Sequence, residues 1–336
     1  MFTSFALIGI SLALASFFAL NVGASALISL FWRIVKPLAR QWSARTRAEC
    51  LFALRIAAPL LSLLVVATLF VPAYVGYEPH GTSEIVSKKL AAFAIVSFLG
   101  LGFASWRAFR SWIATRKLVK QWLRAAVGIR LPFIDIPTFR IAHPFPIIAV
   151  VGMLRPRLFI AEQVLASLTD EELTAAIAHE GGHLAARDNF KRALLRGCRD
   201  LLTIVPSARS LDRAWSESVE CAADEHAAQI SPDIALNLAS ALVRIARMVP
   251  VGVRTELPLA TFLVGEETRG IKVRVRRLIE IASAGRSKRA ERLRLGTVAP
   301  AITLLALFAF TVAVATNPHV LLTVHSVIED VVSLLS

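Results

Sequence analysis

Cysteine and tyrosine are scarce in this sequence. Its 336 residues include three cysteines, Cys50, Cys198 and Cys221, and two tyrosines, Tyr74 and Tyr77. The cysteines show no CxxC spacing, so no disulfide framework is expected. Internal repeats and low-complexity tracts are absent as well. Apolar runs, charges and short motifs therefore carry most of the information in the sequence.

Charged side chains are missing from four long apolar runs, residues 1–32, Ile56–Tyr77, Leu90–Trp106 and Val298–Thr316. A helix that crosses a bilayer needs about 20 apolar residues, within a range of roughly 17–25. All four runs meet this requirement, the third at the short limit. The first run lacks a positively charged start and far exceeds the apolar region of a signal peptide, which favours a retained membrane helix over a cleaved signal sequence.

Basic residues orient the four predicted spans. Arginines and lysines follow the first and third runs and precede the fourth, with few acids among them. By the positive-inside rule these segments face the cytoplasm, so the N-terminus lies outside. The net charge of +14 comes largely from such flanking residues, which meet anionic lipid headgroups. The lipid bilayer is therefore an expected partner, and no nucleic acid is expected.

The chain is predicted to combine a membrane domain with one inserted soluble domain. Residues 1–106 form the membrane domain with three spanning helices, and residues 107–297 form a cytoplasmic domain. A fourth spanning helix over 298–316 precedes an external tail over 317–336. The tail repeats apolar residues at helical spacing, which indicates an interfacial or oligomerising helix, and hence a homo-oligomer, or else an extension of no special role.

The soluble domain is predicted to be mainly helical, with a few short strands. Residues 107–128 form an amphipathic helix, which lies either on the membrane surface or against the domain core. The stretches 131–142 and 146–161 are rich in β-branched and aromatic residues, which indicates short strands or a hairpin. Thr169 and Glu172 then fit a capping box at the start of a helix. Further helices are expected over 210–230, 231–249 and 270–296.

The helix that begins at this capping box contains "HEGGH", residues 179–183. Two histidines four residues apart, His179 and His183, present their imidazoles on one helix face, close enough to share a metal ion. The glutamate after the first histidine, Glu180, reaches water on that metal and acts as general base. The alternative is a pair of histidines on a helix surface with no metal.

A catalytic zinc site needs three protein ligands and an open position for water. Glu220 lies on the next predicted helix, with Asp224 one turn later in "ECAAD". The Glu220 carboxylate completes a His, His, Glu set for Zn²⁺, and Asp224 holds the spare N–H of a liganding histidine. For either acid alone, a solvated helix face is the simpler explanation.

The stretch "LRPRLFIAEQVLASLTDEELTAAIAHEGGHLAARDN" closely resembles the membrane zinc peptidases of the BlaR/MecR antirepressor type. "GIKVRVRRLIE" is similar to the arginine-rich helix after their metal site, and the four-span layout is also theirs. The "ExxAD" pattern around Glu220 looks equally like the HtpX and CAAX-prenyl-protease group. The resemblance implies a zincin domain of the gluzincin kind, with Zn²⁺ on His179, His183 and Glu220 and with Glu180 as the base.

The resemblance also implies that an edge strand near Pro146–Gly152 pairs with the backbone of a protein substrate. It places the protein in a bacterial inner membrane with its active site facing the cytoplasm. Antirepressors that sense β-lactams carry a large external penicillin-binding domain, whereas this sequence ends twenty residues after the fourth run. Sensing by that route is therefore not expected.

The oxyanion of the transition state needs a hydrogen-bond donor. Both tyrosines are predicted at the outer membrane side, which leaves His143, Arg187 and His226. Since His226 lies about 120° around the helix from Glu220, it points elsewhere. His143 precedes the predicted edge strand and is the better candidate, although a single histidine is more often structural.

Three functions are consistent with these residues. A zinc endopeptidase with a regulatory role comes first, and an HtpX-like quality-control protease is its close alternative. A membrane signalling scaffold that keeps a metal helix without catalysis is the third. The substrate is not predicted.

Overall fold

The computed structural model describes residues 2–79, 86–131, 134–201, 207–249, 268–283, 305–306 and 308–335. Part of the predicted loop 78–89, the residues between 250 and 267, and the stretch 284–304 lie outside the described residues. The first seven residues of the predicted fourth span, 298–304, fall in that last stretch. The described part is mostly helical, with one small sheet.

Three helices are long and apolar enough to cross a membrane. They are α1 (Phe2–Ala39), α2 (Ala44–Val65) with its continuation, and α4 (Lys88–Leu123). The second continues through a π-helical turn, Val66–Phe70, into α3 (Val71–Tyr77). Each helix extends beyond its uncharged run into a basic flank. The predictions of these three spans agree with the structure in position and composition.

Serine caps define where two of these helices begin. The Ser43 hydroxyl accepts a hydrogen bond from the Thr46 backbone N–H at 3.1 Å, and Ser87 accepts one from Leu90 at 3.1 Å. Such side chains satisfy backbone donors that have no partner in the first turn of a helix. The second helix therefore starts twelve residues before Ile56, where the uncharged run begins, and these twelve residues carry all of its charged side chains.

The fourth apolar run ends in a bend. Its described end, Phe308–Ala315, meets α12 (Pro318–Leu335) at an angle of 90°. If this bent pair forms one broken span, the described residues contain a fourth candidate membrane span; otherwise they contain three. The predicted tail helix is present as α12, and it packs its Val324 and Ile328 side against Ile8 and Tyr74. Leu322 and Val327, each about half exposed, face away from this contact.

The soluble part contains a four-stranded sheet in the order β1-β2-β4-β3. The strands are β1 (Val127–Ile129), β2 (Thr138–Ile141), β3 (Ile148–Val151) and β4 (Arg157–Ala161). The β3–β4 hairpin is antiparallel, whereas β2 and β4 are parallel. Gly152 adopts φ 111° in the hairpin turn, a conformation that residues with a Cβ rarely take. The strands predicted from 131–142 and 146–161 are therefore present, and β3 is an edge strand.

Helices cover this sheet and form the rest of the domain. They are α5 (Glu162–Ser167), α6 (Asp170–Ala186), α7 (Asp188–Leu201), α8 (Ser207–Ala228), α9 (Pro232–Met248) and α10 (Thr268–Ser283). The core contains β3, β4 and the apolar faces of α6 and α9. Ile148, Phe159 and Leu242 are among its fully buried side chains.

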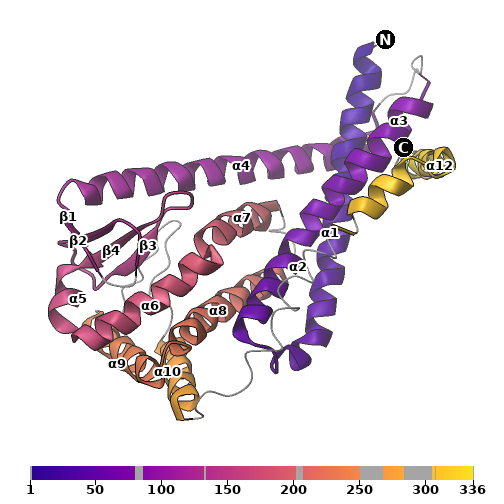
Figure 1. Cartoon of the computed structure of the whole chain (residues 1–336). Coiled ribbons are helices and arrows are strands. Elements are labelled where there is room, and N and C mark those ends of the chain that lie inside the picture. The colour runs from indigo at the N-terminus through magenta and orange to yellow at the C-terminus, as the bar shows by residue number, and fades with distance from the viewer. Residues whose placement is uncertain are drawn as a thin grey trace.

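One long helix joins the two parts of the molecule. Figure 1 shows α4 running from its crossing with α1 to the sheet, without a break at the predicted domain boundary. At its far end Trp122 is buried and packs edge-on against Phe159, with ring centroids 5.1 Å apart. Trp112, two to three turns earlier, is 42% exposed. The core-facing interpretation of residues 107–128 therefore holds for the end of this helix.

The polar start of α2 packs along α8. Arg47 Nε donates to Ser218 Oγ at 2.8 Å, and Arg55 Nε donates to Asp212 Oδ1 at 2.8 Å. The backbone N–H of Ala44 donates to Glu225 Oε2 at 3.1 Å. The second membrane helix is thereby fastened to the helix that carries Glu220, at points on both sides of that residue.

Candidate metal centre

The capping box predicted from the sequence starts α6. Thr169 Oγ accepts from the Glu172 N–H, and Glu172 Oε2 accepts from the Thr169 N–H, at 3.2 and 3.0 Å. Many of the following side chains are small or apolar, which lets α6 pack against both β3 and α8. His179 and Glu180 are fully buried as a result, and His183 is 3% exposed.

His179, His183 and Glu220 come together in the structure. The two Nε2 atoms lie 3.2 Å apart. Glu220 Oε2 lies 3.7 Å from His179 Nε2, and Oε1 lies 3.8 Å from His183 Nε2. A tetrahedral ion bound at about 2.0–2.2 Å holds its ligand atoms at similar separations. Two imidazole nitrogens turned toward each other beside a carboxylate are the donor set that zinc prefers, so these residues fit the ion.

A carboxylate stands behind each histidine. Asp224 Oδ1 lies 2.9 Å from His179 Nδ1, and Asp188 Oδ2 lies 2.7 Å from His183 Nδ1. Such contacts fix the ring orientation and leave Nε2 as the free nitrogen that faces the site. Asp224 was predicted in this role. Asp188 was not, although it directly follows the helix that carries both histidines.

A left-handed residue brings Asp188 back to His183. Arg187, at the C-terminal cap of α6, has φ 54° and ψ 41°. It is the only non-glycine residue with positive φ in the described part of the chain. This conformation ends α6 and starts α7 in a new direction, so that Asp188 and Asn189 face the site. Asn189 donates to the carbonyl oxygens of Val150 on β3 and of Gly152 in the hairpin turn, at 2.9 and 3.3 Å.

Arg274 on α10 completes the cluster. Its Nε and Nη2 donate to both oxygens of Asp224 at 2.8 and 2.7 Å, and its Nη1 lies 3.1 Å from Glu220 Oε2. This nearly buried guanidinium thus contacts both Glu220 and Asp224. Burial disfavours the charge on Asp224, but Arg274 outweighs this effect and holds the pKa of that carboxyl well below its usual range. The sequence indicated an arginine-rich helix here, without showing which arginine faces inward.

The Glu180 carboxylate is enclosed beside the histidines. Both of its oxygens are buried, and neither makes a hydrogen bond of ordinary geometry within the described part of the chain. Burial raises the pKa of Glu180 to about 8, because the charged form loses its water. A carboxyl group with this pKa accepts and returns protons near neutral pH. The orphaned oxygens are a second observation that fits a site built around a metal and a reacting group.

The two histidines differ in protonation. Burial lowers the pKa of His179, and this effect prevails over its contact with Asp224. Burial also disfavours the charged form of His183, but Asp188 and Glu220 outweigh it and raise the pKa of His183 to about 8. Metal binding requires neutral imidazole, so the ion competes with a proton at His183.

The two glycines of the motif have different surroundings. A Cβ on Gly182 would lie 3.0 Å from Ala223 Cα and 3.1 Å from His226 Cβ, because α8 crosses α6 there. A Cβ on Gly181 would meet no atom within 4 Å. Gly182 thus allows the close helix crossing that brings Glu220 to the histidines.

The remaining oxyanion candidates lie in different places. His143 packs its ring against Trp122 and Phe145 and accepts from the Phe145 N–H at 3.1 Å. Burial lowers the pKa of His143. No interaction among the described residues joins it to the three clustered side chains. His226 lies at the crossing of α6 and α8, and Arg187 is exposed. The oxyanion role of His143 stays a prediction.

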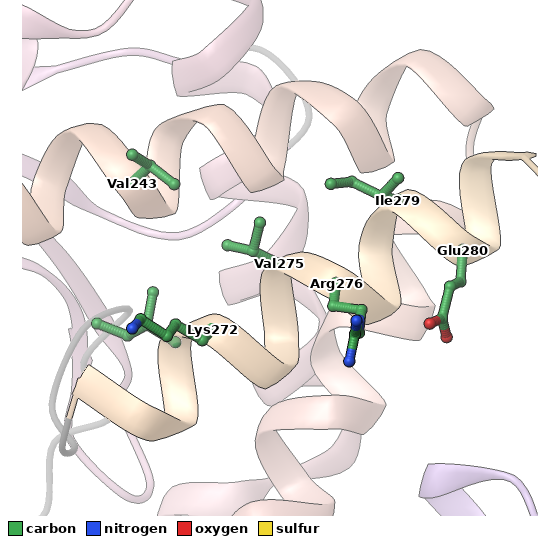
Figure 2. Close-up of a pocket in the computed structure, with 7 residues that line it drawn as sticks. Val243, Lys272, Val275, Arg276, Ile279 and Glu280 are labelled. Atoms are coloured by element: carbon green, nitrogen blue, oxygen red, sulfur yellow. The ribbon is translucent and has the colours of Figure 1, made fainter.

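A groove on the surface of the domain lies apart from this centre. It runs between α9 and α10 and is lined by Val243, Ile271, Lys272, Val275, Arg276, Ile279 and Glu280. Figure 2 shows Val275 and Ile279 turned toward α9, with Arg276 and Glu280 pointing away from it. This face of α10 contributes nothing to the metal centre, which Arg274 reaches from another side of the helix.

Comparison with known proteins agrees with the geometry. The model of peptidase family M48 matches residues 115–256. This stretch includes the end of α4, the sheet and the helices α6, α8 and α9, with all of the clustered side chains except Arg274. No curated protein matches the chain. The match supports a metallopeptidase, and it does not single out the BlaR/MecR type.

Proposed function

We propose that this protein is an integral-membrane zinc endopeptidase that cleaves a protein substrate at the cytoplasmic face of the membrane. The observation that carries the proposal is the convergence of His179, His183 and Glu220 beside the buried Glu180 carboxylate. The family match over residues 115–256 supports the same reaction class. Three apolar helices support the membrane location.

Each residue has a distinct part in the proposed reaction. The two histidine Nε2 atoms and the Glu220 carboxylate would hold Zn²⁺, which supplies Lewis-acid polarisation of a carbonyl and of a water molecule when bound. Glu180 takes the proton from that water and then passes it to the leaving amine. Its raised pKa suits both halves of this transfer. Asp188 and Asp224 keep the imidazoles oriented.

The substrate is proposed to add a strand beside β3. Pairing of an extended peptide with an edge strand supplies backbone hydrogen bonds without demanding a particular sequence. β3 pairs only with β4 in the described sheet, and Asn189 already binds the carbonyl oxygens of Val150 on β3 and of Gly152 in the hairpin turn. Asn189 therefore holds the edge strand at a set distance from α6, where Glu180 lies.

The decisive experiment removes the base and keeps the ligands. Glu180→Gln should bind zinc like the wild type, because it retains all three ligands. Cleavage should fall by a factor of about 10²–10⁴, the usual contribution of one acid–base group. Zinc content by elemental analysis and cleavage of casein or of the protein itself are measured on the same preparation. His183→Ala, which should lose both zinc and activity, is the matched control.

The alternatives make different predictions in this experiment. A non-catalytic scaffold would bind zinc and leave every substrate intact in the wild type as well. A quality-control protease of the HtpX kind would accumulate misfolded membrane proteins in Glu180→Gln cells, whereas a regulatory protease would accumulate one defined protein. Comparing the membrane and cytosolic proteomes of wild-type and variant cells separates these two. Proteolysis retained in Glu180→Gln would refute the assigned base.

A further inference from the structure

A second buried polar cluster lies where α2, α7 and α8 meet. It consists of Arg55 on α2, Arg192 on α7, and Asp212 and Trp215 on α8. Arg55 Nε donates to Asp212 Oδ1 at 2.8 Å, and the Arg192 guanidinium lies 5.8 Å from the centre of the Trp215 ring. Since Asp212 and Trp215 are three residues apart on a helix, they are neighbours on one face. The two arginines thus flank the same turn of α8.

Most hydrogen-bond donors of this cluster have no partner. Four buried nitrogen atoms have no hydrogen-bond partner among the described residues: Arg55 Nη2, Arg192 Nε, Arg192 Nη2 and Trp215 Nε1. The whole Arg55 residue is only 3% exposed and Trp215 only 5%. One acceptor, Asp212 Oδ2, is unpaired beside these four donors. Buried donors are nearly always satisfied, so these four donors together favour the binding of a group with several acceptor atoms.

The charge of the cluster indicates the kind of group. Asp212 pairs with Arg55, whereas Arg192 has no acidic partner among the described residues, so one positive charge of the cluster is not compensated there. Buried charges are normally paired, because removal from water is costly. Ordered water would satisfy the donors but would not balance this charge. An oxyanion does both, and the planar fork of arginine matches the geometry of phosphate oxygens.

The position of the cluster indicates where such an anion would come from. Arg55 is the last charged residue before the uncharged run Ile56–Tyr77. Lipid phosphates lie at this depth, at the boundary between the apolar core of a bilayer and its aqueous surface. We propose that Arg55, Arg192 and Trp215 form a binding site for a phosphate group, carried by an anionic lipid headgroup or by free phosphate.

A bound anion would neutralise the positive charge at the junction between the second membrane helix and α8. Leu51, Leu195 and Leu211 pack around Trp215 in the same cluster, so the anion would lie against an apolar wall. The site is separate from the metal centre, and none of its residues contacts His179, His183 or Glu220 in the described structure. Its existence does not depend on the proposed peptidase activity.

The test uses the full-length protein in nanodiscs of phosphatidylcholine with increasing phosphatidylglycerol. Native mass spectrometry after release into detergent counts the bound lipid, and thermal unfolding with inorganic phosphate tests the free anion. Trp215→Phe removes one donor and keeps the ring, and Arg192→Gln removes the charge. Arg196→Gln, one helical turn further along α7, is the matched control. Circular dichroism and zinc content verify that every variant is folded.

We expect the wild type and Arg196→Gln to retain one phosphatidylglycerol, and the two site variants to bind it at least fivefold more weakly. Stabilisation of the wild type by millimolar phosphate, lost in the same variants, would instead identify free phosphate as the ligand. Binding of neither probe would overturn the proposal. Equal binding by wild type and both site variants would overturn it too, since the lipid would then be held elsewhere.

Discussion

Gly182 shows how a single missing side chain can bring the residues of the candidate metal centre together. It lies between the two histidines of the motif, where α8 passes within contact distance of α6. Helix interiors usually avoid glycine, which costs about 1 kcal/mol relative to alanine. The closer approach of Ala223 and its neighbour Glu220 offsets this cost. Gly181, beside it, has no such contact.

The two glycines should therefore respond oppositely to alanine. Gly182→Ala places a methyl group 3.0 Å from the α8 backbone and should destabilise the fold by about 1–3 kcal/mol. Gly181→Ala should be neutral or stabilising by up to about 1 kcal/mol. Thermal unfolding in detergent, with zinc affinity measured in parallel, distinguishes them. If both substitutions changed stability and zinc affinity equally, Gly182 would not be needed for the close crossing of α6 and α8.

A larger side chain at Gly181 tests the substrate path. Gly181→Leu is expected to keep the fold and the bound zinc, because the position opens to free space, but to impair cleavage where substrate passes. Two quantities are measured on this variant: kcat/KM for a peptide or protein substrate, and the zinc content of the purified protein. Unimpaired cleavage would place the substrate on another side of α6.

The protonation of His183 predicts a pH dependence of metal binding. Its pKa of about 8 in the metal-free protein means that zinc must displace a proton at neutral pH. The apparent affinity for zinc should therefore fall by up to about tenfold for each pH unit below 8, because His183 must lose its proton before it binds the ion. Asp188→Asn removes the partner that raises this pKa, so proton release at pH 7 should decrease. Calorimetry in buffers of different ionisation enthalpy measures the released protons.

The same group affects stability with a defined sign. A histidine whose pKa is raised by folding stabilises the metal-free fold below its unfolded value of about 6.5, and this contribution is lost as the pH rises through about 8. Bound zinc reverses the trend, because its affinity grows as His183 loses its proton.

At the scale of elements, α10 is held to α8 through one arginine. Arg274 contacts Asp224 with two donors and Glu220 with a third, so α10 orients the acids that complete the metal centre. The opposite part of α10 borders the groove of Figure 2. One face of α10 thus supports the candidate metal centre through Arg274, and another face of the same helix borders the groove.

Arg274→Gln should weaken zinc binding by about 10–100-fold, as is usual for partners that orient metal ligands. The reason is that Glu220 and Asp224 would repel each other without the guanidinium between them. Arg276→Gln, on the exposed side of the same helix, is the control and should bind zinc normally. Zinc affinity by competition with a chelating dye provides the measurement. Unchanged affinity in Arg274→Gln would mean that α8 alone orients the ligands.

At the scale of the whole molecule, the membrane helices and the soluble domain share elements. α4 extends from the apolar run to the sheet, and the polar turns of α2 bind α8 at Ser218 and Glu225. Figure 1 shows both helices entering the soluble part at different places. The position of the metal centre relative to the membrane is consequently set by two helices rather than by a flexible linker.

The predicted orientation can be tested with single cysteines. Leu154 in the β3–β4 turn is 80% exposed, and the side chain of Glu329 on α12 is 65% exposed. In a chain whose native cysteines are replaced, Leu154→Cys should react only after membrane permeabilisation, and Glu329→Cys should react from outside. Labelling of intact cells with an impermeant maleimide measures this. Reaction of both from the same side would refute the predicted topology.

The sequence alone determined the features that depend on local order. The capping box at Thr169, the spacing of His179 and His183 and the uncharged runs of three membrane helices are each set by neighbours along the chain, where periodicity and charge are readable. Glu220 and Asp224 were found because their spacing places both on one face of a helix. Only the tertiary structure decided which distant groups meet. Asp188 faces His183 through the unusual backbone of Arg187, and Arg274 reaches α8 from α10. These contacts depend on helix crossings, such as the one at Gly182, and a crossing is a property of packed faces that no short stretch of sequence contains.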